Sequence, residues 1–223
     1  MIRKSNVRNN RTKLYHKLIN NKLVYNNKSL NRYKKDINQN LTNKSKEKLL
    51  KLADLKISIN SIRNCELKKN ATNLVFSDGS PYAQIMIIGE GPGANEDKEG
   101  KPFVGRAGKL LDKMLEAIKL DRKNVYISNV VNFRPPMNRK PTDVEIKRYL
   151  PFLVKHIELI KPKILLLLGS TALNALIGDE VVISKARGKW VNKKIGNVKP
   201  EIIASFHPAF LMRQPDQKKY AWE

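Results

Sequence analysis

Four short apolar segments alternate along this chain with longer segments of helical periodicity, and this alternation constrains the fold most. The apolar segments are residues 83–88, 125–131, 163–168 and 201–205. The segments with helical spacing of apolar residues are residues 106–120, 142–160, 170–177 and 208–212. Alternating strands and helices predict a parallel sheet with helices on both faces. We therefore expect an α/β fold, a three-layer α/β/α domain with a central four-stranded parallel sheet.

The chain also divides into an extension and a domain. Residues 1–42 are rich in Asn, Lys and Arg, and they contain neither Gly nor Pro. Such a segment offers little to a hydrophobic core, so we expect it to be disordered or loosely helical. An amphipathic helix is predicted from residue 44 to 59, because apolar residues recur there at helical spacing. These are Leu49, Leu52, Leu55 and Ile59. We place a basic extension at residues 1–42 and the domain at residues 43–223.

The charge of the chain points to a class of partner. Lys and Arg number 44 against 20 Asp and Glu, which gives a net charge of +24. Residues 1–70 contain 19 basic and 4 acidic residues, or +15 of that total. Such an excess favours a polyanionic partner such as nucleic acid, with an acidic membrane surface as the weaker alternative. The longest aliphatic run, residues 164–168, is far below the ~20 residues of a membrane span, so we expect no membrane association.

Cys65 is the single cysteine of the chain. The chain can therefore form no internal disulfide and no metal site made only of its own thiolates. We expect a reducing compartment, the cytoplasm of a bacterial-type cell. The Arg-rich, acid-poor start also resembles an organellar transit peptide, which is the alternative.

Each predicted strand has a polar residue at or just after its carboxyl end. These residues are Glu90, Asn129, Ser170 and His207. Because ligands bind beyond the carboxyl ends of parallel strands, we expect these residues to line one cleft. The glycine-rich loop of residues 89–103 also exposes backbone amides there. Each residue has a structural alternative: Asn129 as a cap, His207 as a satisfied loop residue, and Phe103 as a core anchor rather than a platform for a flat ring.

Three blocks of the sequence resemble the signatures of family-4 uracil-DNA glycosylases. The blocks are GEGPGANEDKEGKPFVGRAGKLLDKML at residues 89–115, YISNVVNFRPPMNRKPT at residues 126–142 and HPAFLMR at residues 207–213. The resemblance covers residues 52–223. It implies the uracil-DNA glycosylase fold and an enzyme that hydrolyses the N-glycosidic bond of uracil in DNA, which initiates base excision repair. We expect a monomer whose partner is uracil-containing DNA.

The resemblance also assigns roles in uracil binding. Phe103 would stack on the uracil after the nucleotide has swung out of the DNA stack. The amide of Asn129 would accept a hydrogen bond from N3–H and donate one to O4, a pattern that cytosine cannot match. His207 would hydrogen-bond O2, where negative charge develops as the glycosidic bond breaks.

Two carboxylates complete the predicted pocket. Glu90 and the backbone at Gly91 would position the base and an attacking water, which makes Glu90 and His207 the catalytic candidates. Glu96 would exclude the C5 methyl group of thymine. Better-known glycosylases have an aspartate where Gly91 falls, so the sequence offers no obvious strong general base.

The predicted DNA contacts lie outside the base pocket. Arg106, Arg139 and Arg213 are expected to bind DNA. Leu211 has two interpretations, a wedge that fills the gap left by the flipped base or a core residue of its helix.

The chain departs from the family at the iron-sulfur cluster. Family members usually hold a 4Fe-4S cluster through four cysteines, but only Cys65 remains at one of these positions. The other positions hold Ile62, Phe133 and Tyr149, which cannot ligate iron as thiolate does. We therefore expect no cofactor, with ordinary packing in place of the cluster and with activity retained.

Two other classes of protein remain as alternatives. A catalytically inactive DNA-binding homologue would keep the fold and the charge, and a uracil-release assay separates it from an enzyme. A Rossmann-like nucleotide-binding module would use the glycine-rich loop. The loop GEGPG lacks the G-x-G-x-x-G spacing and no Walker lysine follows it, which argues against that module.

Overall fold

The structure, a computed structural model, describes the backbone of residues 32–221 and the side chains of residues 43–221. The chain divides into two units, Met1–Lys46 and Glu47–Glu223. The first described helix, α2, runs over Arg32–Asn60 and begins well before the start predicted at residue 44. The domain boundary predicted after residue 42 falls inside this helix and stays a prediction. Most of the predicted extension, residues 1–31, lies outside the described residues.

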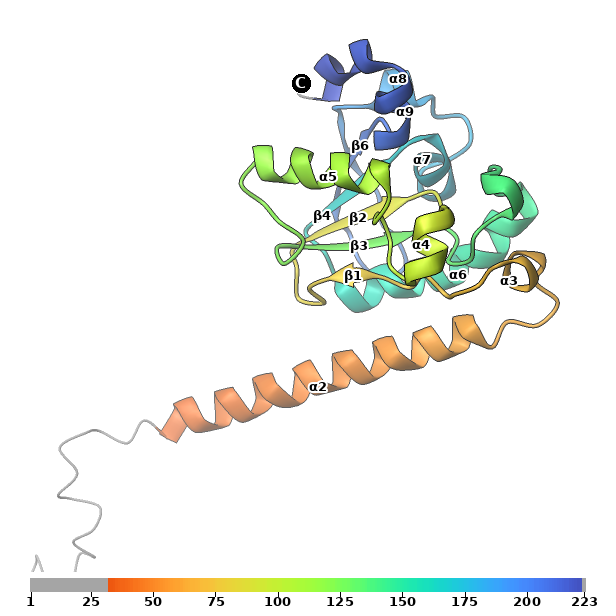
Figure 1. Cartoon of the computed structure of the whole chain (residues 1–223). Helices are drawn as coiled ribbons and strands as arrows, with labels where there is room; N and C mark the ends of the chain where they lie inside the picture. The colour runs from red at the N-terminus through yellow and green to blue at the C-terminus, as the bar shows by residue number, and fades with distance from the viewer. Residues whose placement is uncertain (1–31, 222–223) are drawn as a thin grey trace, which may run out of the picture. The chain divides into compact units, whose positions relative to one another are not determined.

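A six-stranded sheet with the order β1-β3-β2-β4-β6-β5 forms the centre of the second unit (Figure 1). The strands are β1 (Asp78–Gly79), β2 (Ile85–Gly89), β3 (Val125–Asn129), β4 (Ile164–Leu168), β5 (Trp190–Asn192) and β6 (Glu201–Ser205). The four central strands are parallel, which confirms the predicted sheet. The antiparallel edge strands β1 and β5 were not predicted. They are two and three residues long, too short to give a periodic signal.

The predicted helices are all present, and short ones join them. The helices are α3 (Glu66–Asn70), α4 (Ala94–Glu99), α5 (Arg106–Ala117), α6 (Asp143–Ile160), α7 (Ser170–Leu176), α8 (Ile183–Ala186) and α9 (Pro208–Arg213), with the 3-10 helices η1 (Pro136–Asn138) and η2 (Pro215–Ala221). At the start of α6, Thr142 and Glu145 form the capping box predicted from the sequence. The helix α4 lies inside the glycine-rich stretch that the sequence predicts as a loop.

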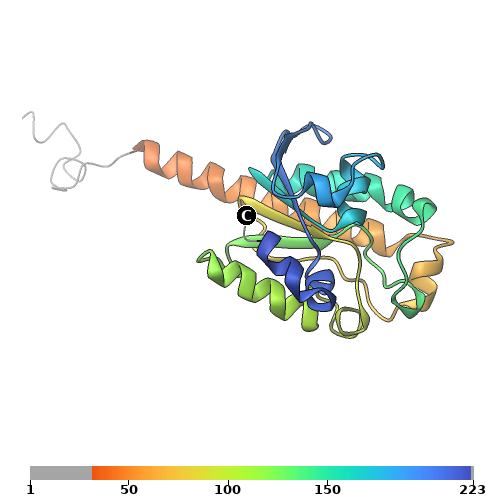
Figure 2. The ribbon, with the colours of Figure 1, turned by 90° about the horizontal axis from the view of Figure 1, so that it is seen from above.

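Helices cover both faces of the sheet, with α5 on one face and α6 on the other (Figure 1, Figure 2). Successive residues of a strand point to opposite faces. Ile87 of β2 accordingly packs in a cluster with Leu111 of α5. Its neighbour Ile88 packs in the larger cluster that contains Ile157 of α6. The parallel strands are buried on both sides, and their carboxyl ends are held at one edge.

The buried face of α2 differs from the predicted face at one position. Leu52, Leu55 and Ile59 are buried as predicted, but Leu49 is 46% exposed. The inward position one turn before Leu52 is instead taken by Lys48, whose Nζ donates to the carbonyl oxygens of Pro81 at 2.9 Å and Ile160 at 3.0 Å. Burial lowers the pKa of the Lys48 ammonium. The stripe was mispredicted at Leu49 because a lysine with an apolar stem occupies the inward position.

Candidate functional site

Three of the four predicted strand-end residues, Glu90, Asn129 and His207, meet at one cavity of about 180 Å³ at the carboxyl edge of the sheet. Its lining includes seven of the predicted residues, Glu90, Gly91, Glu96, Phe103, Asn129, Arg139 and His207. A second cavity of about 550 Å³ shares Glu90, Gly91 and His207 with the first and is also lined by Lys140 and Arg213. The fourth strand-end residue, Ser170, lines this second cavity instead. Pockets for drug-sized ligands measure roughly 300 to 1,000 Å³, so the first cavity suits a small ring.

Asn129 brings an amide to this cavity from the last position of β3. Its side chain is 3% exposed, and its Oδ1 atom has no hydrogen-bond partner among the described residues. In the register of the sheet, Asn129 lies beside Gly89, and a Cβ at Gly89 would come 2.5 Å from Oδ1. An unpaired buried acceptor costs roughly 1 to 3 kcal/mol. A ligand that donates an N–H here would remove that cost.

Phe103 forms a wall of the cavity and is also part of the core. Its ring packs in one cluster with Leu111 and lies with its centroid 5.5 Å from that of the His207 ring, at an interplanar angle of 30°. A Cβ at Gly89 would come 2.6 Å from the Phe103 ring, so the ring fits there only over a glycine. The two interpretations of Phe103, a core anchor and a platform, are therefore compatible.

His207 caps the first turn of α9 and reaches the cavity from the end of β6. The backbone N–H of Ala209 donates to its Nδ1 at 3.2 Å. The pKa of His207 is lowered to about 4, mainly by burial and also by the positive charge of Arg213, whereas the negative charge of Glu96 acts in the opposite direction. A neutral ring that accepts at Nδ1 carries its proton on Nε2. His207 is thus a neutral hydrogen-bond donor at neutral pH.

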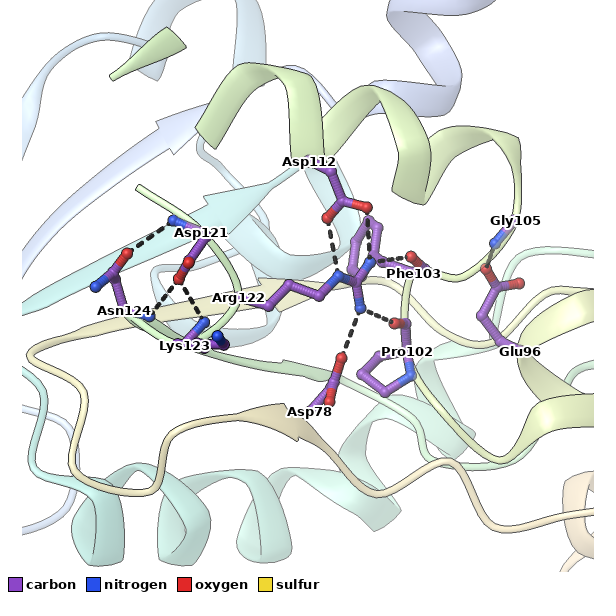
Figure 3. Close-up of polar contacts among 10 residues, drawn as sticks. All are labelled: Asp78, Glu96, Pro102, Phe103, Gly105, Asp112, Asp121, Arg122, Lys123 and Asn124. Atoms are coloured by element: carbon purple, nitrogen blue, oxygen red, sulfur yellow. Dashed lines mark hydrogen bonds and ion pairs between the residues drawn. The ribbon is translucent and has the colours of Figure 1, made fainter. Parts of the chain in front are cut away.

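The two carboxylates of the cavity are held by different parts of the fold. Thr171, in the first turn of α7, donates its hydroxyl to Oε2 of Glu90. Glu96 bridges the loop, because its Oε2 accepts from the Gly93 N–H at 3.1 Å and its Oε1 from the Gly105 N–H at 2.7 Å (Figure 3). The role of Glu96 against the thymine methyl group stays a prediction.

Some residues of the site were not predicted. Ala107, Pro135 and Asn138 line the first cavity, and Thr171 orients Glu90. Pro135 and Asn138 stand in the second signature block, whereas Thr171 follows the predicted strand-end residue Ser170 by one position. Only the direction of the first turn of α7 decides which of these two hydroxyls meets Glu90.

The predicted DNA-binding arginines have different surroundings. Arg106 and Arg213 are exposed, and Arg213 lines the second cavity. Arg139 forms two hydrogen bonds to the carboxylate of Glu145, at 2.7 and 2.8 Å. A phosphate group at Arg139 would therefore compete with Glu145.

The interpretation of Leu211 as a wedge is corrected by the structure. The side chain is 1% exposed and lines a separate apolar cavity of about 290 Å³ together with Leu115 and Ile203. In α9 it faces α5 and the sheet, because a leucine gains more free energy from burial there than from exposure to water. Leu211 is a core residue, the second of the two interpretations.

The positions of the family's cluster are filled by packed side chains. Cys65, Phe133 and Tyr149 are buried in one core cluster, and Ile62 packs against it. The Sγ atom of Cys65 lies 3.3 Å from the hydroxyl of Tyr149. No group of three or more metal-ligating residues occurs among the described residues. A single thiol in a core of apolar and aromatic side chains does not fit a four-iron cluster.

Comparisons with known proteins show the family to which the chain belongs. The family model of the uracil DNA glycosylase superfamily matches residues 76–223. The type-4 uracil-DNA glycosylase of Archaeoglobus fulgidus is 39% identical over 172 residues, which are 75% of this chain and 86% of that protein. The type-4 enzyme of Thermotoga maritima is 44% identical over 67% of this chain and 77% of its own length. The chain therefore belongs to the uracil DNA glycosylase superfamily and, within it, to the type-4 family. No helix in the described part of the chain is long and apolar enough to cross a membrane.

Proposed function

We propose that this protein is a uracil-DNA glycosylase, a hydrolase that cleaves the N-glycosidic bond of uracil in DNA and so initiates base excision repair. Membership of the type-4 family supports this function for the whole domain. At the site, the main support for this function is the buried Oδ1 of Asn129, an acceptor without a hydrogen-bond partner in the described part of the chain. The imide N3–H of uracil is the donor that this atom lacks.

Recognition requires that the nucleotide leaves the DNA stack, since the pocket is too small to admit a duplex. The extruded ring would lie against Phe103, and Asn129 would read its edge. The amide of Asn129 offers one acceptor and one donor in the order that uracil N3–H and O4 require. Cytosine presents an acceptor at N3 and a donor at N4, the reverse order, so it would leave Oδ1 facing a lone pair. A good bidentate contact to a base contributes ~1 to 3 kcal/mol of discrimination.

The chemical step separates charge. One residue, His207, lies where the negative charge develops, and another, Glu90, lies where the positive charge develops. As the bond between C1′ and N1 breaks, the bonding electrons pass to uracil, and O2 gains negative charge. The neutral His207 would donate Nε2–H to O2 and stabilise the uracilate leaving group. The sugar gains positive charge, which the carboxylate of Glu90 stabilises while it orients the attacking water. As the water oxygen bonds to C1′, the proton that it loses passes to the Glu90 carboxylate. The hydroxyl of Thr171 keeps that carboxylate in one place.

Uracil-containing DNA is the partner that the charge of the chain supports. Arg106, Arg139 and Arg213 would contact phosphate groups, and Arg213 lines the cavity next to the base pocket. We include in the proposal that the protein acts as a monomer in a reducing, cytoplasmic compartment. The single cysteine supports the reducing compartment.

We also propose that the protein works without an iron-sulfur cluster. The support is the contact between Cys65 and Tyr149 and the apolar packing of Ile62 and Phe133 at the other positions. The packed side chains hold together the segments on which these residues lie, so the base pocket needs no metal to keep its shape.

The test is release of uracil by the purified protein. An oligonucleotide with one uracil is incubated with the protein and then treated with alkali, which cleaves the strand at an abasic site. We expect cleavage at the uracil and none in a matched oligonucleotide with thymine at that position. A preparation of the folded Asn129→Asp variant controls for contaminating glycosylases. Binding to the uracil oligonucleotide without any cleavage would instead identify an inactive DNA-binding homologue.

A further inference from the structure

Arg122 ties together the backbone beneath the base pocket and lies outside every signature block (Figure 3). Its guanidinium donates to the carbonyl oxygen of Pro102 at 3.1 Å and to the carbonyl oxygen of Phe103. The same group pairs with Oδ2 of Asp78 at 2.7 Å and with Oδ1 of Asp112 at 2.8 Å. Two carboxylates from β1 and α5 thus fix the guanidinium, and the guanidinium fixes the end of the loop.

The loop needs such a clamp because Phe103 has an unfavourable backbone conformation. Its φ angle is +54°, in the left-handed region that a residue with a Cβ rarely adopts. Residues in this region persist only where their surroundings hold them there. The Phe103 carbonyl, which this conformation turns toward Arg122, is the group that the arginine binds.

Two glycines, Gly108 and Gly89, leave the space that Phe103 occupies. A Cβ at Gly108 in α5 would lie 1.7 Å from the Phe103 carbonyl oxygen. A Cβ at Gly89 would lie 2.6 Å from the ring itself. The backbone of Phe103 therefore fits between α5 and Arg122, and its ring fits over the end of β2. The position of the ring in the pocket depends on all three contacts.

We propose that Arg122 is a positioning residue for uracil excision, which acts through Phe103 by holding the Pro102 and Phe103 carbonyls so that the ring keeps its place against the extruded base. This inference rests on the proposed function. Arg122 does not line the base pocket, so it is not a catalytic residue. Its effect reaches the reaction only through the position of the Phe103 ring.

Lysine cannot replace this arginine. A guanidinium presents five N–H donors in a planar fork, and here they reach two carbonyls and two carboxylates. An ammonium group is a single point of charge and cannot reach acceptors on opposite sides at once. The Arg122→Lys variant keeps the charge next to Asp78 and Asp112 and releases the loop carbonyls.

The first test compares single-turnover excision of uracil by wild type and Arg122→Lys. We expect a rate about 10 to 100 times lower, because a misplacement of about 1 Å can cost ~100-fold in rate. Binding to undamaged duplex should not change. Arg148→Lys is the matched control, since Arg148 also donates to two backbone carbonyls, those of Arg63 and Asn64, and none of these three residues lines the cavity. Its excision rate should equal that of wild type.

The second test separates positioning from general loss of structure. In the Phe103→Ala background, Arg122→Lys should leave the excision rate unchanged, although it should still lower the melting temperature. A structural role would lower the rate by the same factor in both backgrounds, and that result overturns the proposal. Guanidinium ion should restore part of the rate of Arg122→Ala, whereas sodium chloride at the same ionic strength should not.

A binding measurement keeps the inference apart from the proposed function. Free uracil is titrated into wild type, Arg122→Lys and Arg148→Lys by calorimetry. The affinity should fall only in Arg122→Lys, and equal affinities in all three proteins would overturn the role of Arg122. If wild type binds uracil but releases none from DNA, the proposed enzyme function fails while the positioning role is still decided by these affinities.

Discussion

Asn129 and Asn132 are two buried amides three residues apart, and the fold uses them differently. The Nδ2 of Asn132 donates to the backbone carbonyl oxygen of Val75 at 3.0 Å, and the Val75 N–H donates to the backbone carbonyl oxygen of Asn132 at 2.9 Å. The Oδ1 of Asn129 has no such partner in the part of the chain that the structure describes. Asn132 therefore stabilises the fold, whereas Asn129 is available to a ligand.

This contrast gives the first prediction. Asn129→Asp removes the donor to O4 and places negative charge beside two oxygens that gain electron density during cleavage. Single-turnover excision of uracil from a single-stranded oligonucleotide should fall about 10- to 100-fold, the equivalent of a lost bidentate base contact of ~1 to 3 kcal/mol. A cytosine oligonucleotide is measured in parallel, because a carboxylate can accept from cytosine N4–H. Asn132→Asp is the control. It should lower the melting temperature but leave the excision rate per folded molecule close to that of wild type. A wild-type rate in folded Asn129→Asp would mean that Asn129 is only a strand cap.

The second prediction concerns the titration of His207. Its pKa is about 4 in the folded protein and about 6.5 in the unfolded chain, so between these values only the unfolded chain binds the proton. The free energy of unfolding should therefore fall as the pH drops from about 6.5 to 4, by up to ~1.4 kcal/mol per pH unit for one histidine. His156 is also buried, and burial lowers its pKa to about 3, so it too lowers the free energy of unfolding as the pH drops. Thermal melting across this range should show a shallower slope for His207→Gln than for wild type. Equal slopes would show that the folded protein does not keep His207 neutral.

At the scale of elements, the sequence predicted what is long and periodic. The four parallel strands, α5 and α6 were predicted within a few residues, because each has several apolar residues on one face. The strands β1 and β5 and the helix α4 have only two, three and six residues, too few for a periodic pattern, so tertiary contacts decide them. The direction of α9 was also beyond the sequence, since a helix of six residues has apolar side chains on more than one side. That ambiguity explains the two interpretations of Leu211.

The candidate site follows the same division. Residues at strand ends were predicted, because the topology of a parallel sheet brings them to one edge. Arg122 and Thr171 were missed, although they hold the loop and Glu90. Arg122 acts across 19 residues to Phe103, and Thr171 across 81 residues to Glu90. Contacts of this kind depend on the packed structure and leave no pattern in the sequence.

The third prediction tests the packing that stands at the positions of the cluster. Purified protein should be colourless, without the broad absorbance and bound iron of an iron-sulfur centre. Cys65→Ser should fold and release uracil at nearly the wild-type rate, with a loss of stability near the ~1 kcal/mol typical of point mutations. Tyr149→Ala should cost several times more, ~3 to 5 kcal/mol, because it empties a buried aromatic site. Brown protein with about four irons per chain would contradict the proposed absence of the cluster.

At the scale of the whole molecule, the large positive net charge is not explained by the residues of the base pocket. Residues 1–42 hold eleven basic residues and one acidic residue, +10 of the net +24. The side chains of this segment lie outside the part of the chain that the structure describes. Phosphate contacts by such a segment would add affinity for DNA without adding a preference for uracil.

The last prediction is that deletion of residues 1–42 weakens DNA binding and leaves base choice unchanged. Each phosphate that a cationic side chain neutralises adds ~0.9 to the slope of log affinity against log salt on duplex DNA, so the slope should become shallower by that amount per lost contact. The control keeps the chain length and replaces Lys4, Lys13, Lys17 and Lys22 by Gln. If the charge of the segment binds phosphate, the salt slope of this variant should become shallower by ~0.9 for each of up to four lost contacts. A role in targeting predicts no change in slope for either variant. Affinity is measured by fluorescence anisotropy over a range of salt concentrations, and single-turnover excision from uracil and thymine oligonucleotides is measured at saturating protein. A truncated protein with reduced affinity, a shallower slope and the wild-type saturated rate would assign the extension to phosphate binding and the base pocket to Glu47–Glu223 alone.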